Sequence, residues 1–262
     1  MKHWTKRLFA LAAPLLLSGC LWGPGKFASD LTLRKNGTFV LDYRGEIVIQ
    51  LPPDEDSAPW TDAKASCQTD AKTRPCTKAE IAEQKADFQE KAASKRKENE
   101  EMAKAFGLPG LDDESNRAFA TKLMKYAGWR SVTYRGKGVF DVDYHFEGRA
   151  TQDFLFPALP DNDLIIPFIA IRRRADGSVL VTAPALTGGA GPLAARAGSA
   201  ATSKTSEGFL SRADGRFTVI TNGEILTNNS EDGAAPHAVG RQVHWDVGPG
   251  SNKIPETLIR LQ

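Results

Sequence analysis

The chain has 262 residues, of which 41% are hydrophobic and 25% are charged. Its 34 basic and 32 acidic side chains nearly balance, so the sequence lacks the large positive charge by which proteins bind nucleic acid. A chain of this length can bury a core, as one large domain or as one domain with a helical insertion.

The first 19 residues have the three parts of a secretory signal peptide. Basic side chains precede an apolar run from Leu8 to Leu17, and small residues follow it. The run is too short to span a bilayer of about 30 Å as a helix. Removing this leader takes three of the 34 basic residues and leaves 31 against 32 acidic ones, so the mature protein is nearly neutral.

The sequence Leu-Leu-Leu-Ser-Gly-Cys at residues 15–20 resembles the lipobox of bacterial lipoproteins. The resemblance implies cleavage before Cys20, a diacylglyceryl group on its sulfur with palmitate among the acyl chains, and membrane attachment through it. Leu21 follows the cysteine where aspartate would retain the protein, which favours the outer membrane, facing the periplasm. The alternatives are an uncleaved core helix, or an ordinary signal peptide with an incidental cysteine.

Two further cysteines, Cys67 and Cys76, remain as a pair in the mature chain. An oxidising compartment favours a structural disulfide between them, which would contribute about 2 to 4 kcal/mol. A redox site is the alternative, because Cys76 precedes a predicted helix start, where a thiolate is stabilised. The pair lacks CxxC spacing and neighbouring metal ligands, which favours the structural bridge.

The mature chain is predicted to begin with a tether and a hairpin. Residues 20–29 contain Gly-Pro-Gly and are predicted to be a lipidated tether. Over residues 31–43, apolar and polar side chains alternate on both sides of Asn36-Gly37, which is typical of a β-hairpin. Residues 52–75 are rich in Pro, Asp, Ser and Lys without periodicity, which indicates a loop closed by the cysteine pair.

A long charged helix is predicted next. Thr77-Lys-Ala-Glu80 is a capping box, and the helix continues to about residue 106. Residues 78–106 hold seven basic and seven acidic side chains, and the apolar stripe is narrow. A solvated helix pinned at its ends explains this composition, and a docking or coiled-coil arm is the alternative. A second helix begins near Asp112, so that residues 77–127 form a helical insertion.

The clearest strand in the sequence spans residues 140–147. Its acidic and imidazole side chains share one face and could suggest a metal site. Strand neighbours on one face lie about 7 Å apart, too far for three of them to share one ion unaided. A solvated sheet face explains the pattern, so no metal site is expected. The side chains alternate between Phe140, Val142, Tyr144 and Phe146 on one face and Asp141, Asp143, His145 and Glu147 on the other.

The segment from Phe154 to Ile171 is strongly apolar and contains three prolines. One interpretation is two buried strand ends joined by a turn, since burial is the commoner fate of apolar residues. The other is a hydrophobic surface that contacts lipid or another amphiphile. In that case the candidate lipid-binding residues are Phe154, Phe156, Ile165, Ile166 and Phe168.

The rest of the chain is predicted to form strands and a loop, and it contains no recognisable catalytic motif. A hairpin turn is expected at Asp176-Gly177, and strands over residues 212–219 and 241–247. Residues 187–206 predict a surface loop, whose loose dinucleotide fingerprint lacks the required βαβ unit. No HExxH, GxSxG, P-loop or catalytic-cysteine motif occurs. We therefore expect neither an enzyme nor a cofactor.

Four segments together resemble a group of uncharacterised alphaproteobacterial envelope lipoproteins. They are the lipobox, residues 35–47 (KNGTFVLDYRGEI), residues 127–157 (AGWRSVTYRGKGVFDVDYHFEGRATQDFLFP) and residues 215–229 (GRFTVITNGEILTNN) with a later His-Trp. More distantly, the order of strands, inserted helices and a final strand with Trp245 is similar to the LppM-like lipoproteins. That similarity implies a curved sheet packed on helices, with a hydrophobic pocket for lipid, and no catalytic residues carry over.

These features predict an α+β protein with a single domain over residues 30–262. A curved antiparallel β-sheet carries the inserted pair of α-helices at 77–127. Two non-enzymatic functions follow. The sheet and the 154–171 segment form a cleft for a lipid or other amphiphile, or the protein is an envelope assembly or scaffolding partner that docks through its charged helix. A continuous apolar cavity under the sheet favours the first function, and a filled core with an exposed helix favours the second.

Overall fold

The computed structural model describes residues 22–49, 60–69, 72–105, 112–158, 167–187, 213–251 and 253–261. Its residues divide into two compact units. Unit 1 lies within residues 1–50 and 112–262, and unit 2 lies within residues 51–111. The leader, Cys20 and the loose dinucleotide fingerprint lie outside the described residues, so those expectations stay predictions.

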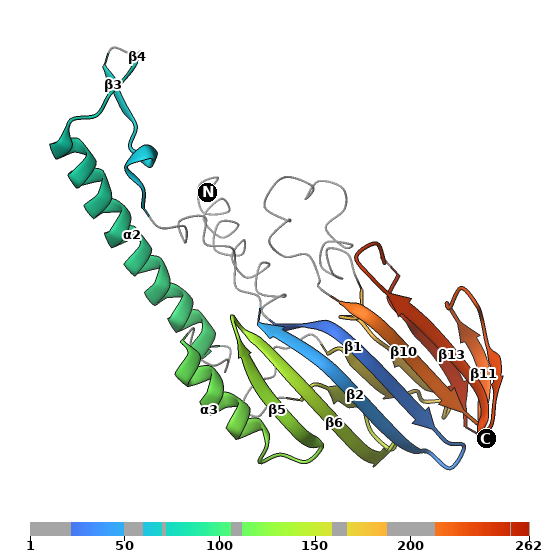
Figure 1. Cartoon of the computed structure of the whole chain (residues 1–262). Helices are drawn as coiled ribbons and strands as arrows, with labels where there is room; N and C mark the ends of the chain where they lie inside the picture. The colour runs from blue at the N-terminus through green and yellow to red at the C-terminus, as the bar shows by residue number, and fades with distance from the viewer. Residues whose placement is uncertain are drawn as a thin grey trace, which may run out of the picture. The chain divides into compact units, whose positions relative to one another are not determined.

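Unit 1 contains a seven-stranded sheet in the order β12-β13-β10-β1-β2-β6-β5 (Figure 1). Its pairs are antiparallel except for β1 and β10, which run parallel. The prediction of a wholly antiparallel sheet was wrong here, because a long intervening chain permits a parallel crossover. The strands are β1 (Trp22–Leu33), β2 (Thr38–Ile49), β5 (Trp129–Gly136), β6 (Val139–Arg149), β10 (Asp214–Thr221), β12 (Ala235–His237) and β13 (Gly240–Val247).

A second, five-stranded sheet in unit 1 is antiparallel throughout, in the order β11-β14-β9-β8-β7. The fold is therefore α+β with two packed sheets, where the sequence predicted one curved sheet. Alternating hydrophobicity specifies which face of a strand is buried but not which sheet it joins. The strands are β7 (Phe154–Phe156), β8 (Ile169–Arg173), β9 (Val179–Thr182), β11 (Glu224–Asn228) and β14 (Glu256–Arg260).

Aromatic side chains fill the space between these two sheets. Tyr43 of β2 and Tyr144 of β6 both contact Phe156 of β7, with ring centroids 5.0 and 4.5 Å apart. Phe168, just before β8, packs on Phe156 at 5.9 Å. The two sheets thus pack face to face through a shared aromatic core, as inward-facing side chains of paired sheets do.

The hairpin of β1 and β2 confirms the Asn36-Gly37 turn, with Gly37 at a φ of 80° that favours glycine. Residues 22–29, predicted to belong to the tether, instead form the first part of β1. Trp22 and Phe27 are buried there, and their burial favours a strand. The Gly-Pro-Gly sequence is accommodated because the β1–β2 register shifts between Pro24 and Phe27.

The two predicted helices belong to different units. Helix α3 (Asp113–Leu123) lies in unit 1, where Phe119 packs edge-on against Trp22 and also contacts Phe140. Helix α2 (Lys78–Ala105) lies in unit 2. The predicted insertion at 77–127 was therefore wrong at both ends: the inserted unit lies within 51–111, and α3 buries an apolar face on the sheet of unit 1.

Unit 2 also contains a 3-10 helix, η3 (Asp62–Lys64), and a short hairpin of β3 (Cys67–Thr69) and β4 (Lys72–Arg74). The sequence predicted an irregular loop here. The predicted capping box is confirmed, since Glu80 N–H donates to Thr77 Oγ1 and Thr77 N–H donates to the Glu80 carboxylate. Within the described residues, no helix is long and apolar enough to cross a membrane.

Candidate functional site

The predicted lipid-binding residues are only partly within the described residues. Phe156 and Phe168 are both 0% exposed and belong to the aromatic core. Phe154 is half-buried and contacts the Phe39 ring at 5.0 Å. Ile165 and Ile166 lie outside the described residues. The interpretation of this segment as buried strand ends therefore describes Phe156 and Phe168, which do not line an open cleft.

A polar pocket of about 260 Å³ lies beside β13, in unit 1. It collects residues from β13, from the loop after β11 and from the loop before β14. No signal in the sequence indicates this pocket, because these segments lie far apart along the chain and match no motif. The lining residues are Asn229, Glu231, Asp232, His244, Trp245, Asp246, Val247, Gly250, Ser251, Lys253 and Pro255.

Asn229 fixes one wall of this pocket. Its Oδ1 accepts hydrogen bonds from Trp245 Nε1 and from the Glu256 backbone N–H, both at 2.9 Å. Its Nδ2 donates to the Ile254 carbonyl at 2.7 Å. One amide thus joins the end of β11 to β13 and to the start of β14, and it satisfies the N–H of a buried indole.

The charged groups of the pocket are already paired. Asp232 lies 3.1 Å from His244 Nε2, and Asp246 lies 2.6 Å from Arg216 Nε. Hydrogen bonding to that guanidinium lowers the pKa of Asp246 below its ordinary value. Ser230 Oγ donates to the His244 carbonyl and not to its imidazole. The arrangement gives surface ion pairs, which contribute little to stability, and no nucleophile activated by His244.

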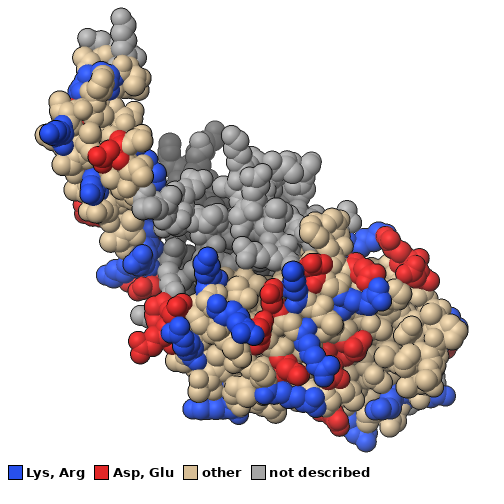
Figure 2. Space-filling model, in the orientation of Figure 1, with Lys and Arg blue, Asp and Glu red and all other residues tan. Residues whose placement is uncertain are grey.

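The polar face of β6 carries ion pairs with its neighbours and no metal cluster. Among the described residues, no group of three or more His, Cys, Asp or Glu side chains could hold a metal ion. Figure 2 shows basic and acidic side chains interspersed over one face of unit 1. The pairs on β6 are Asp143 with Arg44, Asp141 with Arg135, and His145 with Asp42 at 2.8 Å and Glu147 at 3.3 Å.

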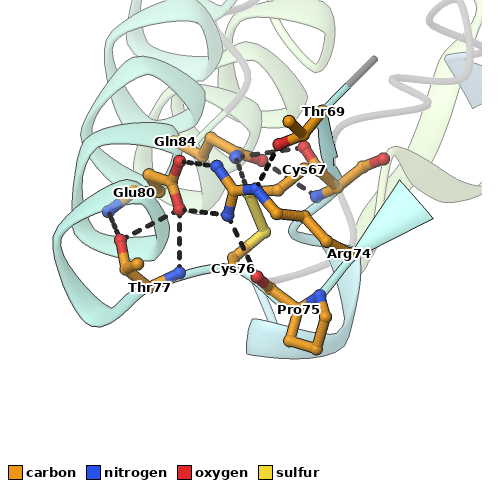
Figure 3. A network of polar contacts seen from close by, with 9 residues as sticks. Cys67, Thr69, Arg74, Pro75, Cys76, Thr77, Glu80 and Gln84 are labelled. Atoms are coloured by element: carbon orange, nitrogen blue, oxygen red, sulfur yellow. Dashed lines mark hydrogen bonds and ion pairs between the residues drawn. A yellow bond between two sulfur atoms is a disulfide. The ribbon is translucent and has the colours of Figure 1, made fainter. Parts of the chain in front are cut away.

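Unit 2 has a disulfide between Cys67 and Cys76, as predicted. Cys67 is buried, and Gln84 of α2 holds the segment beside it (Figure 3). Gln84 Oε1 accepts from the Ser66 N–H at 3.1 Å, and Gln84 Nε2 lies 3.4 Å from Cys67 Sγ. The bridge thus fastens the β3–β4 hairpin to the first turns of α2.

An ion pair reinforces this clamp. The Arg74 guanidinium forms two hydrogen bonds to the Glu80 carboxylate, one of them at 2.9 Å, and Arg74 Nε donates to Thr69 Oγ1 at 2.8 Å (Figure 3). The hydrogen bonds from Arg74, with those from Thr77, lower the pKa of Glu80 to about 2. The carboxylate therefore stays ionised at neutral pH and caps the helix start.

Beyond this clamp, α2 makes few contacts with other described residues. None of its described side chains is buried. Phe88 is half-buried, with its ring 5.5 Å from the Trp60 ring and 5.2 Å from Lys64 Nζ. Residues 93–98 are all exposed. The helix is thus supported near its start and presents a charged surface further along.

No family model matches the sequence, and no curated protein does. Among solved structures, the folded domain of LppM from Mycobacterium tuberculosis is similar with a TM-score of 0.22 and 12% identity, over 92% of this chain and 91% of that chain. A TM-score this low assigns no fold, so the function is inferred from the residues.

Proposed function

We propose that the protein is a non-enzymatic bacterial envelope lipoprotein that acts as an assembly partner, docking on another envelope protein through α2. Cys20 carries the lipid and holds the protein on the outer membrane, facing the periplasm. The observation that carries the docking role is α2 itself: a helix of 28 residues, clamped at its start, with no described side chain buried.

The length and polarity of α2 support this role. At 1.5 Å per residue, 28 residues extend about 42 Å. Helices in proteins gain most of their stability by burying an apolar face, and a helix that is polar all round commonly bridges between bodies. The disulfide and the capping box supply rigidity at one end only. The exposed side chains at 93–94 and 96–98 would be the surface that contacts the partner.

The filled aromatic core favours docking over the lipid-binding alternative. A lipid site built on Phe156 and Phe168 would require opening contacts between the two sheets. The other predicted lipid-binding residues are Phe154, which is half-buried, and Ile165 and Ile166, which lie outside the described residues. The paired charges of the pocket support a non-enzymatic role, since His244 pairs with Asp232 and Asp246 pairs with Arg216.

Site-specific photocross-linking in cells tests the docking role. A photoreactive amino acid at Lys97 of α2 should give a discrete cross-linked product. The same substitution at Arg174, in the exposed β8–β9 turn of unit 1, serves as the matched control and should give none. Equal products from both positions, or none from Lys97, would contradict docking through α2.

Native mass spectrometry separates the lipid-binding alternative from docking. The soluble Cys20→Ser protein is incubated with total envelope lipid and then desalted. Docking predicts the mass of the polypeptide alone. A discrete added mass that organic solvent extracts would favour the lipid-binding function.

A further inference from the structure

The structure places β1 directly after the proposed lipidation site. Only Leu21 separates Cys20 from Trp22, which is 5% exposed and packs against Phe119 and Phe140. Two residue steps span at most about 7 Å. If Cys20 is acylated, as proposed above, the start of β1 must therefore lie at the membrane surface.

The same end of the seven-stranded sheet also carries the β5–β6 turn. Trp22 pairs with Ile49 at the end of β2, and the Ile49 N–H donates to the Gly138 carbonyl at 2.8 Å. Adjacent strands lie about 4.8 Å apart, so this turn is about 10 Å from the start of β1. The β1–β2 turn with Lys35 is at the opposite end, about 36 Å along the strands.

Lys137 stands at the tip of the β5–β6 turn. It is the one described residue other than glycine with a positive φ, 53°, and it lies between Gly136 and Gly138. Glycine adopts this conformation at less cost than lysine. The side chain is exposed and forms no ion pair with a described residue. The ammonium of Lys137 is therefore exposed at the tip of the turn.

The turn is held firmly under Lys137. Gly138 N–H donates to Tyr134 Oη at 3.4 Å, and Tyr134 Oη donates to Asp113 Oδ1 at 2.8 Å. The carboxylate of Asp113 also pairs with Arg117. The end of β2 and the start of α3 thus both brace the backbone of the turn that carries Lys137.

We propose that Lys137 binds the phosphate of anionic phospholipid headgroups in the membrane that holds Cys20. An ammonium near such a surface gains a favourable interaction, which falls off within a Debye length of about 8 Å at physiological salt. Lys137 lies within reach of that layer, whereas Lys35 is too far along the strands. The contact fixes how unit 1 stands on the membrane.

Amine labelling of the lipidated full-length protein tests this contact. The protein is reconstituted in vesicles that contain phosphatidylglycerol or only phosphatidylcholine, and the acetylation rates of Lys137 and Lys35 are measured by peptide mass spectrometry. We expect Lys137 to react about fivefold more slowly in the anionic vesicles than in the neutral ones. Lys35 should react equally in both, and 1 M salt should abolish the difference.

The outcomes separate this inference from the proposed lipoprotein function. Intact mass first establishes whether Cys20 carries acyl chains, and their absence would refute the lipoprotein itself. With acylated protein, equal reactivity of Lys137 in the two kinds of vesicle would refute the headgroup contact alone. Protection of Lys35 to the same extent would also refute it, since that would show no preferred orientation.

Discussion

Removing the Cys67–Cys76 disulfide should unfold unit 2 and leave unit 1 folded. The two cysteines are nine residues apart, so the bridge closes a loop of about ten residues. The chain-entropy relation for such a loop gives about 2.7 kcal/mol at 25 °C. Unit 2 buries few described side chains, and a unit this small depends on such links. A loss of this size should exceed its stability.

The double variant Cys67→Ser, Cys76→Ser measures this directly. Circular dichroism at 222 nm during urea unfolding reports mainly α2, the longest described helix. Tryptophan fluorescence reports unit 1 once Trp60→Phe removes the indole of unit 2. We expect the helical signal to be lost at lower urea while the fluorescence midpoint stays within error. Equal shifts of both midpoints, or no shift of either, would refute the assignment of the disulfide to an independently stabilised unit 2.

Three further predictions concern single side chains. Phe156→Ala should lower the free energy of unfolding of unit 1 by about 3 to 5 kcal/mol in urea titrations, whereas Leu155→Ala, at a side chain 41% exposed, should cost less than about 0.5 kcal/mol; similar costs would contradict the filled core. The lowered pKa of Glu80, about 2 against 4.5, means that its contribution to unit 2 is complete above pH about 4.5 and is lost as pH falls toward about 2. Glu80→Gln should therefore weaken the helical signal at pH 7 and flatten its acid dependence, and an unchanged pH profile would argue against the clamp. Asn229→Ala leaves the Trp245 indole N–H without its acceptor and should destabilise unit 1 by about 1 to 3 kcal/mol, while Asn229→Asp, which keeps the acceptor, should lose less.

Local signals in the sequence identified the turns and helix starts, because their physical causes are local. Asn36-Gly37 specifies a tight turn through the glycine at positive φ. Thr77 and Glu80 specify a helix start through reciprocal hydrogen bonds three residues apart. The Cys67–Cys76 bridge joins two cysteines that are only nine residues apart. Each of these features needs only a few neighbouring residues.

Pairings between distant segments could not be predicted in this way. The parallel contact of β1 with β10 joins Lys26 to Asp214 in register, and no pattern within either strand indicates its partner. The pocket beside β13 depends on this same long-range assembly. Asn229 alone connects three segments there, but in the sequence it is an ordinary polar residue at the end of a strand.

The two helices differ in whether their residues form an apolar face that can be buried. Helix α3 has Phe119, Ala120 and Leu123 on one face, and it buries them against the sheet of unit 1. Helix α2 has no comparable apolar face among its described side chains. It is held at its start by the Cys67–Cys76 disulfide and by the ion pair of Arg74 with Glu80. None of the described side chains of α2 beyond its start is buried. If α2 docks on a partner as proposed, a substitution that gave it an apolar face for its own unit should weaken that docking.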